Sequence, residues 1–137
     1  MKPEMFNQYI AETLSRINDF KTPEASSPIT PDRITCHAGN CSFTINWQGE
    51  MRPCVMLTKP AASVFDIGFE NAWRYITEET DKILLSSKCA ACAFKCLCRT
   101  CAASALLETG NFDGTPDYMC RYTKESYKQI CSEINLK

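Results

Sequence analysis

Apolar residues recur at helical spacing near the start of the chain. Within residues 3–20 they are Phe6, Ile10, Leu14 and Ile17. Positions three or four apart share one face of an α-helix, so this pattern predicts an amphipathic helix. Residues 21–33 then carry three prolines among serines and threonines. Proline lacks the amide donor that a helix interior needs, so we expect an extended linker or covering strap there.

Apolar and polar residues alternate in the segment CSFTINWQGEMRPCVML. The apolar residues on one side of this segment are Phe43, Ile45 and Trp47. A turn at residues 48–50 separates them from a second apolar run at residues 51–57. Alternation on both sides of a glycine-containing turn predicts a short antiparallel hairpin, because Gly49 supplies the positive φ that such turns often need. The hairpin would bring Cys54 back toward Cys41.

Helical spacing returns in the second half of the chain. Residues 69–85 form one predicted helix, and AASALLET forms a shorter one that stops at Gly110. Residues 111–120 are rich in Asn, Asp, Gly and Pro and are expected to form a loop, followed by a last helix at 123–134. The fold class expected is therefore small α+β. We divide the chain into residues 1–35, which form a helix and a proline-rich linker, and residues 36–137, which form the main domain.

Charge and hydropathy narrow the possible partners. The 137 residues carry a formal net charge of −1. This balance favours neither nucleic acid nor an anionic membrane surface as a partner. No apolar stretch approaches the ~18 residues of a membrane span, and charged residues interrupt the N-terminal segment where a signal peptide would be apolar. The expected location is the cytoplasm, where clustered thiols are more often metal ligands than disulfides.

Ten cysteines are the main chemical feature, and five of them lie in CAACAFKCLCRTC. Two C-x2-C pairs occur in this segment, and each lets one tight turn present two thiolates to one metal or cluster. The eight candidate ligands are Cys36, Cys41, Cys54, Cys89, Cys92, Cys98, Cys101 and Cys120. Eight thiolates make two sets of four, which suit either two zinc ions or two four-iron clusters. Spacing alone leaves the metal, and the division into sets, open.

The remaining candidates have simpler interpretations. Cys96 fits a spacer whose side chain points away from the turn, and Cys131 fits a small core residue of the last helix. His37, the single histidine, is interpreted as a surface loop residue. Trp47, Trp73, Phe69 and Tyr75 are expected to pack rather than to bind.

The order of the cysteines resembles a known family. It reads Cys36, twelve residues, Gly49, four residues, Cys54, a gap, Cys89-x2-Cys92-x5-Cys98-x2-Cys101, a gap and Cys120. This pattern is similar to the seven-cysteine signature of the SPASM domain, the C-terminal auxiliary-cluster module of radical S-adenosylmethionine (SAM) enzymes that modify peptides and proteins. The family usually has three residues before the cysteine that matches Cys101, where this chain has Arg99 and Thr100.

The resemblance implies two [4Fe-4S] clusters with crossed ligation. The first would be held by Cys36, Cys41, Cys54 and Cys101. The second would be held by Cys89, Cys92, Cys98 and Cys120. Four cysteine ligands leave no open iron, so the clusters would transfer electrons without binding substrate directly. We also expect backbone N–H bonds to the sulfurs from Gly39, Ala91 and Thr100.

The function implied is an auxiliary cluster domain that mediates electron transfer during radical modification of a peptide or protein. SAM cleavage needs a C-x3-C-x2-C site on a barrel of roughly 200 residues or more, which these 137 residues do not contain. The chain alone is therefore not expected to be catalytic. Its partners would be a radical SAM barrel, whose last helix residues 3–20 resemble, and a peptide or protein substrate. The alternatives are a free-standing cytosolic zinc-binding interaction module and a small ferredoxin-like electron carrier.

Overall fold

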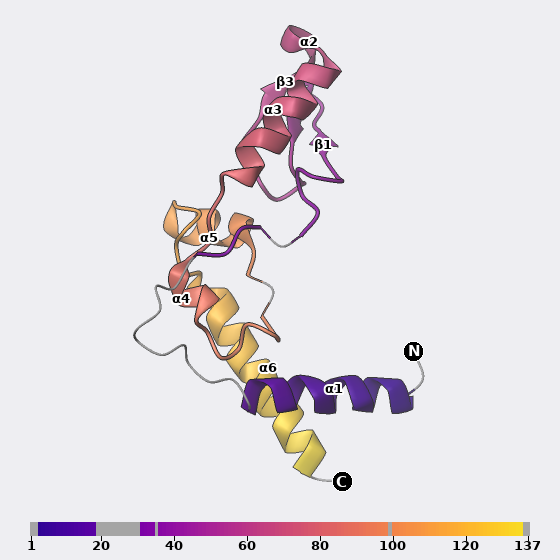
Figure 1. The fold of residues 1–137 in the computed structure, drawn as a ribbon, viewed down its shortest axis with the longest axis vertical. Coiled ribbons are helices and arrows are strands. Elements are labelled where there is room, and N and C mark those ends of the chain that lie inside the picture. The colour runs from indigo at the N-terminus through magenta and orange to yellow at the C-terminus, as the bar shows by residue number, and fades with distance from the viewer. Residues whose placement is uncertain (1–2, 19–30, 35, 99, 136–137) are drawn as a thin grey trace.

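A computed structural model describes residues 3–18, 31–34, 36–98 and 100–135. Its elements are α1 (Pro3–Asn18), β1 (Thr44–Ile45), β2 (Glu50–Arg52), β3 (Ala62–Ser63), α2 (Val64–Ile67), α3 (Phe69–Asp81), α4 (Ser87–Ala90), α5 (Ala102–Thr109) and α6 (Asp117–Asn135). The protein is thus small and α+β, as predicted. Figure 1 shows the sheet with α2 and α3 at one end, α5 in the middle and α6 running toward the other end.

The predicted hairpin is present and has a third strand. The antiparallel sheet has the order β1-β2-β3, with Ile45 opposite Met51 and Met51 opposite Ala62. At the turn, Oδ1 of Asn46 accepts hydrogen bonds from the backbone N–H groups of Gln48 (3.0 Å) and Glu50 (2.9 Å). Since β3 is only two residues long, its alternation was too short to be recognised in the sequence.

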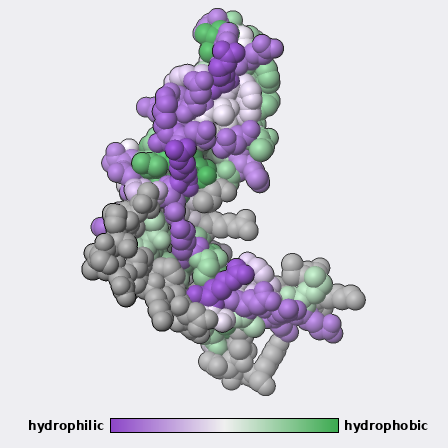
Figure 2. Space-filling view, viewed as in Figure 1, coloured by the Kyte–Doolittle hydropathy of each residue, from purple (hydrophilic) through white to green (hydrophobic). Residues whose placement is uncertain are grey.

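Helix α3 covers the sheet and forms the first core. Met51, Ala62, Ala72 and Ile76 are buried together, with Val64 and Trp73 packed against them. Apolar side chains also remain exposed at this end, among them Ile45, Trp47, Phe65 and Ile67. Figure 2 shows hydrophobic residues gathered on the surface around the α2 end of the molecule.

The predicted helix at 69–85 is too long, because α3 ends at Asp81. The following residues are extended: Ile83 and Leu85 are buried, whereas Leu84 between them is exposed. The backbone N–H of Leu85 donates to the carbonyl of Asp32 at 2.7 Å, and Leu84 pairs with Arg33 in an antiparallel bridge. Pairing with a distant segment therefore replaces the last helical turn. Of the linker expected at residues 21–33, residues 21–30 lie outside the described residues.

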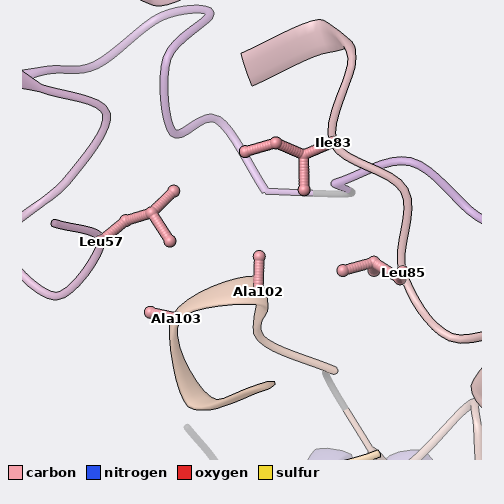
Figure 3. Packing of buried hydrophobic residues seen from close by; sticks show 5 residues of the cluster. All are labelled: Leu57, Ile83, Leu85, Ala102 and Ala103. Atoms are coloured by element: carbon pink, nitrogen blue, oxygen red, sulfur yellow. The ribbon is translucent and has the colours of Figure 1, made fainter. Parts of the chain in front are cut away.

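A second core lies between the hairpin end and α5. Leu57, Ile83, Leu85, Ala102 and Ala103 form one buried cluster and come from three separate segments. Figure 3 shows the side chains of Leu57, Ile83, Leu85 and Ala102 pointing toward one another. Ile34, Cys54, Cys101 and Phe112 pack against this cluster. Two cysteines from distant parts of the sequence are thus held beside one apolar core.

Helix α6 begins earlier than predicted. The loop expected at 111–120 ends at Pro116, and Asp117–Asn135 is helical. Proline is favoured just before or at the first turn of a helix, because its missing N–H needs no partner there. The backbone N–H of Tyr118 donates to a carboxylate oxygen of Glu108 at 3.0 Å, so a side chain of α5 caps this helix. Cys120 consequently lies in the first turn of α6 and not in a loop.

Helix α1 covers residues 3–18 of the predicted range 3–20, and residues 19 and 20 lie outside the described residues. Thr13 is buried, and its hydroxyl donates to the Tyr9 carbonyl at 2.8 Å. Of the helices within the described ranges, none combines the length and the apolar character that a membrane span requires.

Candidate metal centres

One site is built by the cysteine-rich segment and the start of α6. Cys89 lies on α4, where its backbone N–H donates to the Ser86 carbonyl at 2.9 Å. The chain then coils through successive tight turns: the N–H of Cys92 donates to the Cys89 carbonyl at 3.2 Å, and that of Cys98 donates to the Phe94 carbonyl at 2.7 Å. These turns bring three thiols, three to nine residues apart in the sequence, to one cavity.

These thiols line a small cavity of about 40 Å³, which we call the second cavity. Its lining consists of Cys89, Cys92, Phe94, Lys95, Cys98, Thr100, Cys120, Thr123 and Lys124. The four cysteines in this set are those that the resemblance assigns to the second cluster. Cys120 reaches the cavity from α6, so the site joins two separate elements.

The thiols of this site influence one another electrostatically. Burial raises the pKa of the Cys89 thiol, hydrogen bonds with the side chains of Thr100 and Ser86 oppose the shift, and Cys98 and Cys92 raise it further. Burial also raises the pKa of the Cys120 thiol, followed by the effects of Cys89, Cys98 and Cys92. Burial and the neighbouring thiols thus disfavour the thiolate forms of Cys89 and Cys120.

Four free thiols are a type of donor that zinc ions and iron–sulfur clusters take. All ten cysteines carry free thiols, so none of these four is used in a disulfide. Bound metal deprotonates a coordinating thiol outright, which removes the penalty that burial and like charge place on the thiolate. Within the described residues, no group of three or more His, Cys, Asp or Glu side chains is arranged so that it could hold a single metal ion.

Another site lies against the Leu57 core. We call it the first cavity, because its cysteines are among those that the resemblance assigns to the first cluster. It has a volume of about 440 Å³. Its lining consists of Ile34, Cys36, Ala38, Cys54, Leu57, Thr100, Cys101, Ala102 and Ala103. Three of the four cysteines that the resemblance assigns to the first cluster are therefore together. The fourth, Cys41, is exposed and is not among the described residues that line this cavity.

One sulfur of the first cavity accepts a hydrogen bond from a backbone N–H group. The N–H of Leu57 donates to Sγ of Cys54 at 3.3 Å. The donors expected from the sequence are different: the N–H groups of Gly39 and Ala91 are used by the carbonyls of Ser42 (2.9 Å) and Ser87 (3.1 Å), so that part of the expectation is wrong. N–H bonds to sulfur stabilise the charge of a cluster ligand and tune its potential.

Sequence reasoning named only the backbone of Thr100 as part of the sites, and it missed the Thr100 side chain and Lys124. The side chain of Thr100 lines both cavities, which places the two sites next to each other. Lys124 lines the second cavity and lowers the pKa of the Cys120 thiol, although it is the last of the causes that act on that pKa. The signal for Lys124 was its position four residues after Cys120, which places both on one face of a helix.

The other candidates lie apart from the two cavities. Cys96 is exposed, and His37 is exposed as well. Cys131 is half-buried on α6, and its hydrogen bond raises the pKa of the Tyr127 hydroxyl, with burial of that hydroxyl as the next cause. Tyr127 also contacts Phe94 edge to face, with ring centroids 5.4 Å apart.

The chain was compared with protein families, curated proteins and solved structures. No protein-family model, no curated protein and no solved structure matches the chain.

Proposed function

We propose that this chain binds two [4Fe-4S] clusters and acts as an auxiliary cluster domain of a radical SAM maturase. One observation carries the proposal: four free thiols, two from the turns after α4, one from α4 itself and one from α6, line a single small cavity. Their identity agrees with the second set implied by the SPASM resemblance. The proposed clusters supply one-electron transfer during radical modification of a peptide or protein.

The chain's own residues have separate roles in this proposal. Cys89, Cys92, Cys98 and Cys120 hold the second cluster. Cys36, Cys54 and Cys101, which line the first cavity, hold the first cluster together with Cys41, the fourth ligand that the resemblance assigns. The backbone N–H of Leu57 and the hydroxyl of Thr100 donate to sulfurs and help to set the two potentials. SAM is bound and cleaved by a barrel domain that acts with this chain.

The first test measures the metal. The protein is purified and reconstituted without oxygen, and iron, acid-labile sulfide and zinc are quantified per chain. The proposal expects about eight iron atoms per chain from two four-iron clusters, with an equal amount of sulfide. A colourless protein with about two zinc ions and no sulfide would instead establish the zinc-binding module.

The second test uses the division of neighbouring cysteines between the cavities. Cys98→Ala and Cys101→Ala change positions only three apart, yet each is expected to remove a different cluster and about half of the iron. Electron paramagnetic resonance (EPR) of the dithionite-reduced variants distinguishes the two losses by the remaining signal. Cys96→Ala, an exposed cysteine of the same segment, is the matched control and is expected to keep both signals. Loss of the same signal in both variants would contradict the division.

A further inference from the structure

Two further cavities adjoin each other beside α3 and share no described lining residue with the two cysteine sites. One has a volume of about 520 Å³ and the other about 600 Å³. Both are bordered by Lys59, Glu79, Ile83 and Phe112. We call the two cavities together the α3 groove. Each volume falls within the range of about 300–1,000 Å³ that is typical of sites for small molecules.

The walls of the α3 groove belong to packed parts of the fold. Tyr75 and Glu79 are four residues apart on α3, so they lie on one face of the helix. Ile83 is buried in the Leu57 core, and Phe112 packs against the same core. The groove lies where the end of α3 approaches α5 (Figure 1). Because these residues are held by the fold itself, the groove is formed before any ligand binds.

Most charges on the α3 groove are already paired. Nη2 of Arg52 donates to a carboxylate oxygen of Glu50 at 2.6 Å, and this hydrogen bond is the main reason why the pKa of Glu50 is lowered. Lys82 pairs with Glu79 at the end of α3, and that bond is the main reason why the pKa of Lys82 is raised. The two pairs therefore offset their own charges.

Two opposite charges remain on the groove. The side chains of Lys59 and Asp113 are exposed, and neither has a hydrogen bond or an ion pair with any described residue. Lys59 borders both cavities and Asp113 borders the larger one, yet the two side chains do not pair with each other. A ligand that carries one negative and one positive charge can meet both.

The smaller cavity offers an apolar surface beside Lys59. Its uncharged lining is mostly apolar or aromatic and includes Pro60, Ala61, Tyr75, Ile83 and Phe112. Apolar and aromatic walls with a few placed polar groups are typical of small-molecule sites. An apolar side chain that enters this cavity is removed from water, which favours binding.

We infer that the α3 groove binds a small zwitterion with an apolar side chain, of the class of the hydrophobic α-amino acids. The carboxylate of the ligand pairs with Lys59, and its ammonium group pairs with Asp113. Its side chain enters the smaller cavity, which Tyr75 and Phe112 line. The inference does not depend on the proposed function, because no cysteine and no cluster takes part in binding.

The first experiment titrates the anaerobically purified full chain with L-phenylalanine and follows ¹H–¹⁵N correlation spectra. Saturable shifts are expected for the amide signals of Ala61, Ile83 and Phe112, with a Kd of about 2 mM for a ligand of this size. Absence of saturable shifts at about ten times that concentration would overturn the inference.

Two analogues test the recognition of each charge. Phenethylamine lacks the carboxylate of L-phenylalanine, and 3-phenylpropionate lacks its ammonium group. Each is expected to bind about two- to fivefold more weakly, which is the loss that removal of one exposed ion pair causes. If either analogue bound with the same Kd as L-phenylalanine, the site would recognise one charge only, and the zwitterion would be refuted.

Lys59→Ala and Asp113→Asn assign the two charges to their partners. Each should raise the Kd for L-phenylalanine about two- to fivefold. Lys59→Ala should bind phenethylamine as tightly as L-phenylalanine, and Asp113→Asn should do the same with 3-phenylpropionate. Lys88→Ala is the matched control, since this exposed lysine of α4 borders neither cavity, and it should keep the wild-type Kd. An equal loss of affinity in Lys88→Ala and Lys59→Ala would report net charge alone and would overturn the role of Lys59.

Discussion

Replacement of Gly39 by alanine tests how the turn that carries Cys41 is held. Gly39 has φ = +76°, a left-handed conformation that costs an L-residue about 1–2 kcal/mol. The added methyl group also collides with the buried side chain of Thr80, and inserting a methyl into a packed site costs about 1–3 kcal/mol. We expect Gly39→Ala to lower the free energy of unfolding by about 2–5 kcal/mol, the sum of these two effects.

Gly110 offers a matched control for the backbone contribution. Its φ is +77°, but a methyl group at Gly110 would meet nothing within 4 Å. Gly110→Ala should therefore cost only the left-handed term of about 1–2 kcal/mol. The difference between the two variants isolates the collision with Thr80. This difference in the free energy of unfolding should become smaller in a Thr80→Ala background. That substitution removes Oγ1 and Cγ2, two of the three Thr80 atoms close to the added methyl group.

The assay is urea denaturation of the anaerobically reconstituted proteins, followed by far-ultraviolet circular dichroism and by cluster absorbance. With a slope of about 1–3 kcal/mol per molar urea, the extra cost at Gly39 should separate the two midpoints measurably. The first cluster should also be lost before the second in Gly39→Ala, because the turn that follows Cys36 is displaced. Equal midpoints for Gly39→Ala and Gly110→Ala would refute the packing argument.

Three further substitutions, one of them with an exposed control, test the buried Thr80 hydroxyl, the Leu57 core and the boundary between the sites. Thr80→Val should be neutral or stabilise the protein in urea denaturation by about 1 kcal/mol, because the buried Thr80 hydroxyl has no partner among the described residues. Leu57→Ala should cost about 2–5 kcal/mol in the same assay, whereas Leu107→Ala, 68% exposed, should stay within about 0.5 kcal/mol. Thr100→Val should make the potential of the second cluster more negative in an EPR-monitored redox titration, because Cys89 loses a hydrogen bond that stabilises negative charge; an unchanged potential would exclude that role.

The hairpin could be predicted because its signals are local. Alternating apolar residues and a glycine in the turn act within a few residues of one another, and the paired strands follow them. The end of α3 could not be predicted in this way. Ile83 and Leu84 fit helical spacing as well as extended spacing, and the choice is made by hydrogen bonding to Asp32, about fifty residues earlier in the sequence.

The predicted start of α6 was wrong for a similar reason. Asp117 and its neighbours have the composition of a loop, yet Pro116 precedes the helix and Glu108 caps it from another element. At the site, the spacing of the cysteines indicated metal ligands but could not divide them into sets. The position of Cys41 depends on packing between Gly39 and Thr80, a contact that no local pattern records.

The division of Cys98 and Cys101 between the cavities has a structural explanation. The N–H of Cys98 is tied to the Phe94 carbonyl, within the turns that form the second cavity. Cys101 directly precedes α5, whose first residues, Ala102 and Ala103, are buried in the Leu57 core beside the first cavity. Each cysteine is therefore held by a different packing unit. If the proposed clusters bind, each would fix one of these two cysteines, so folding of the segment and loading of both sites would depend on each other.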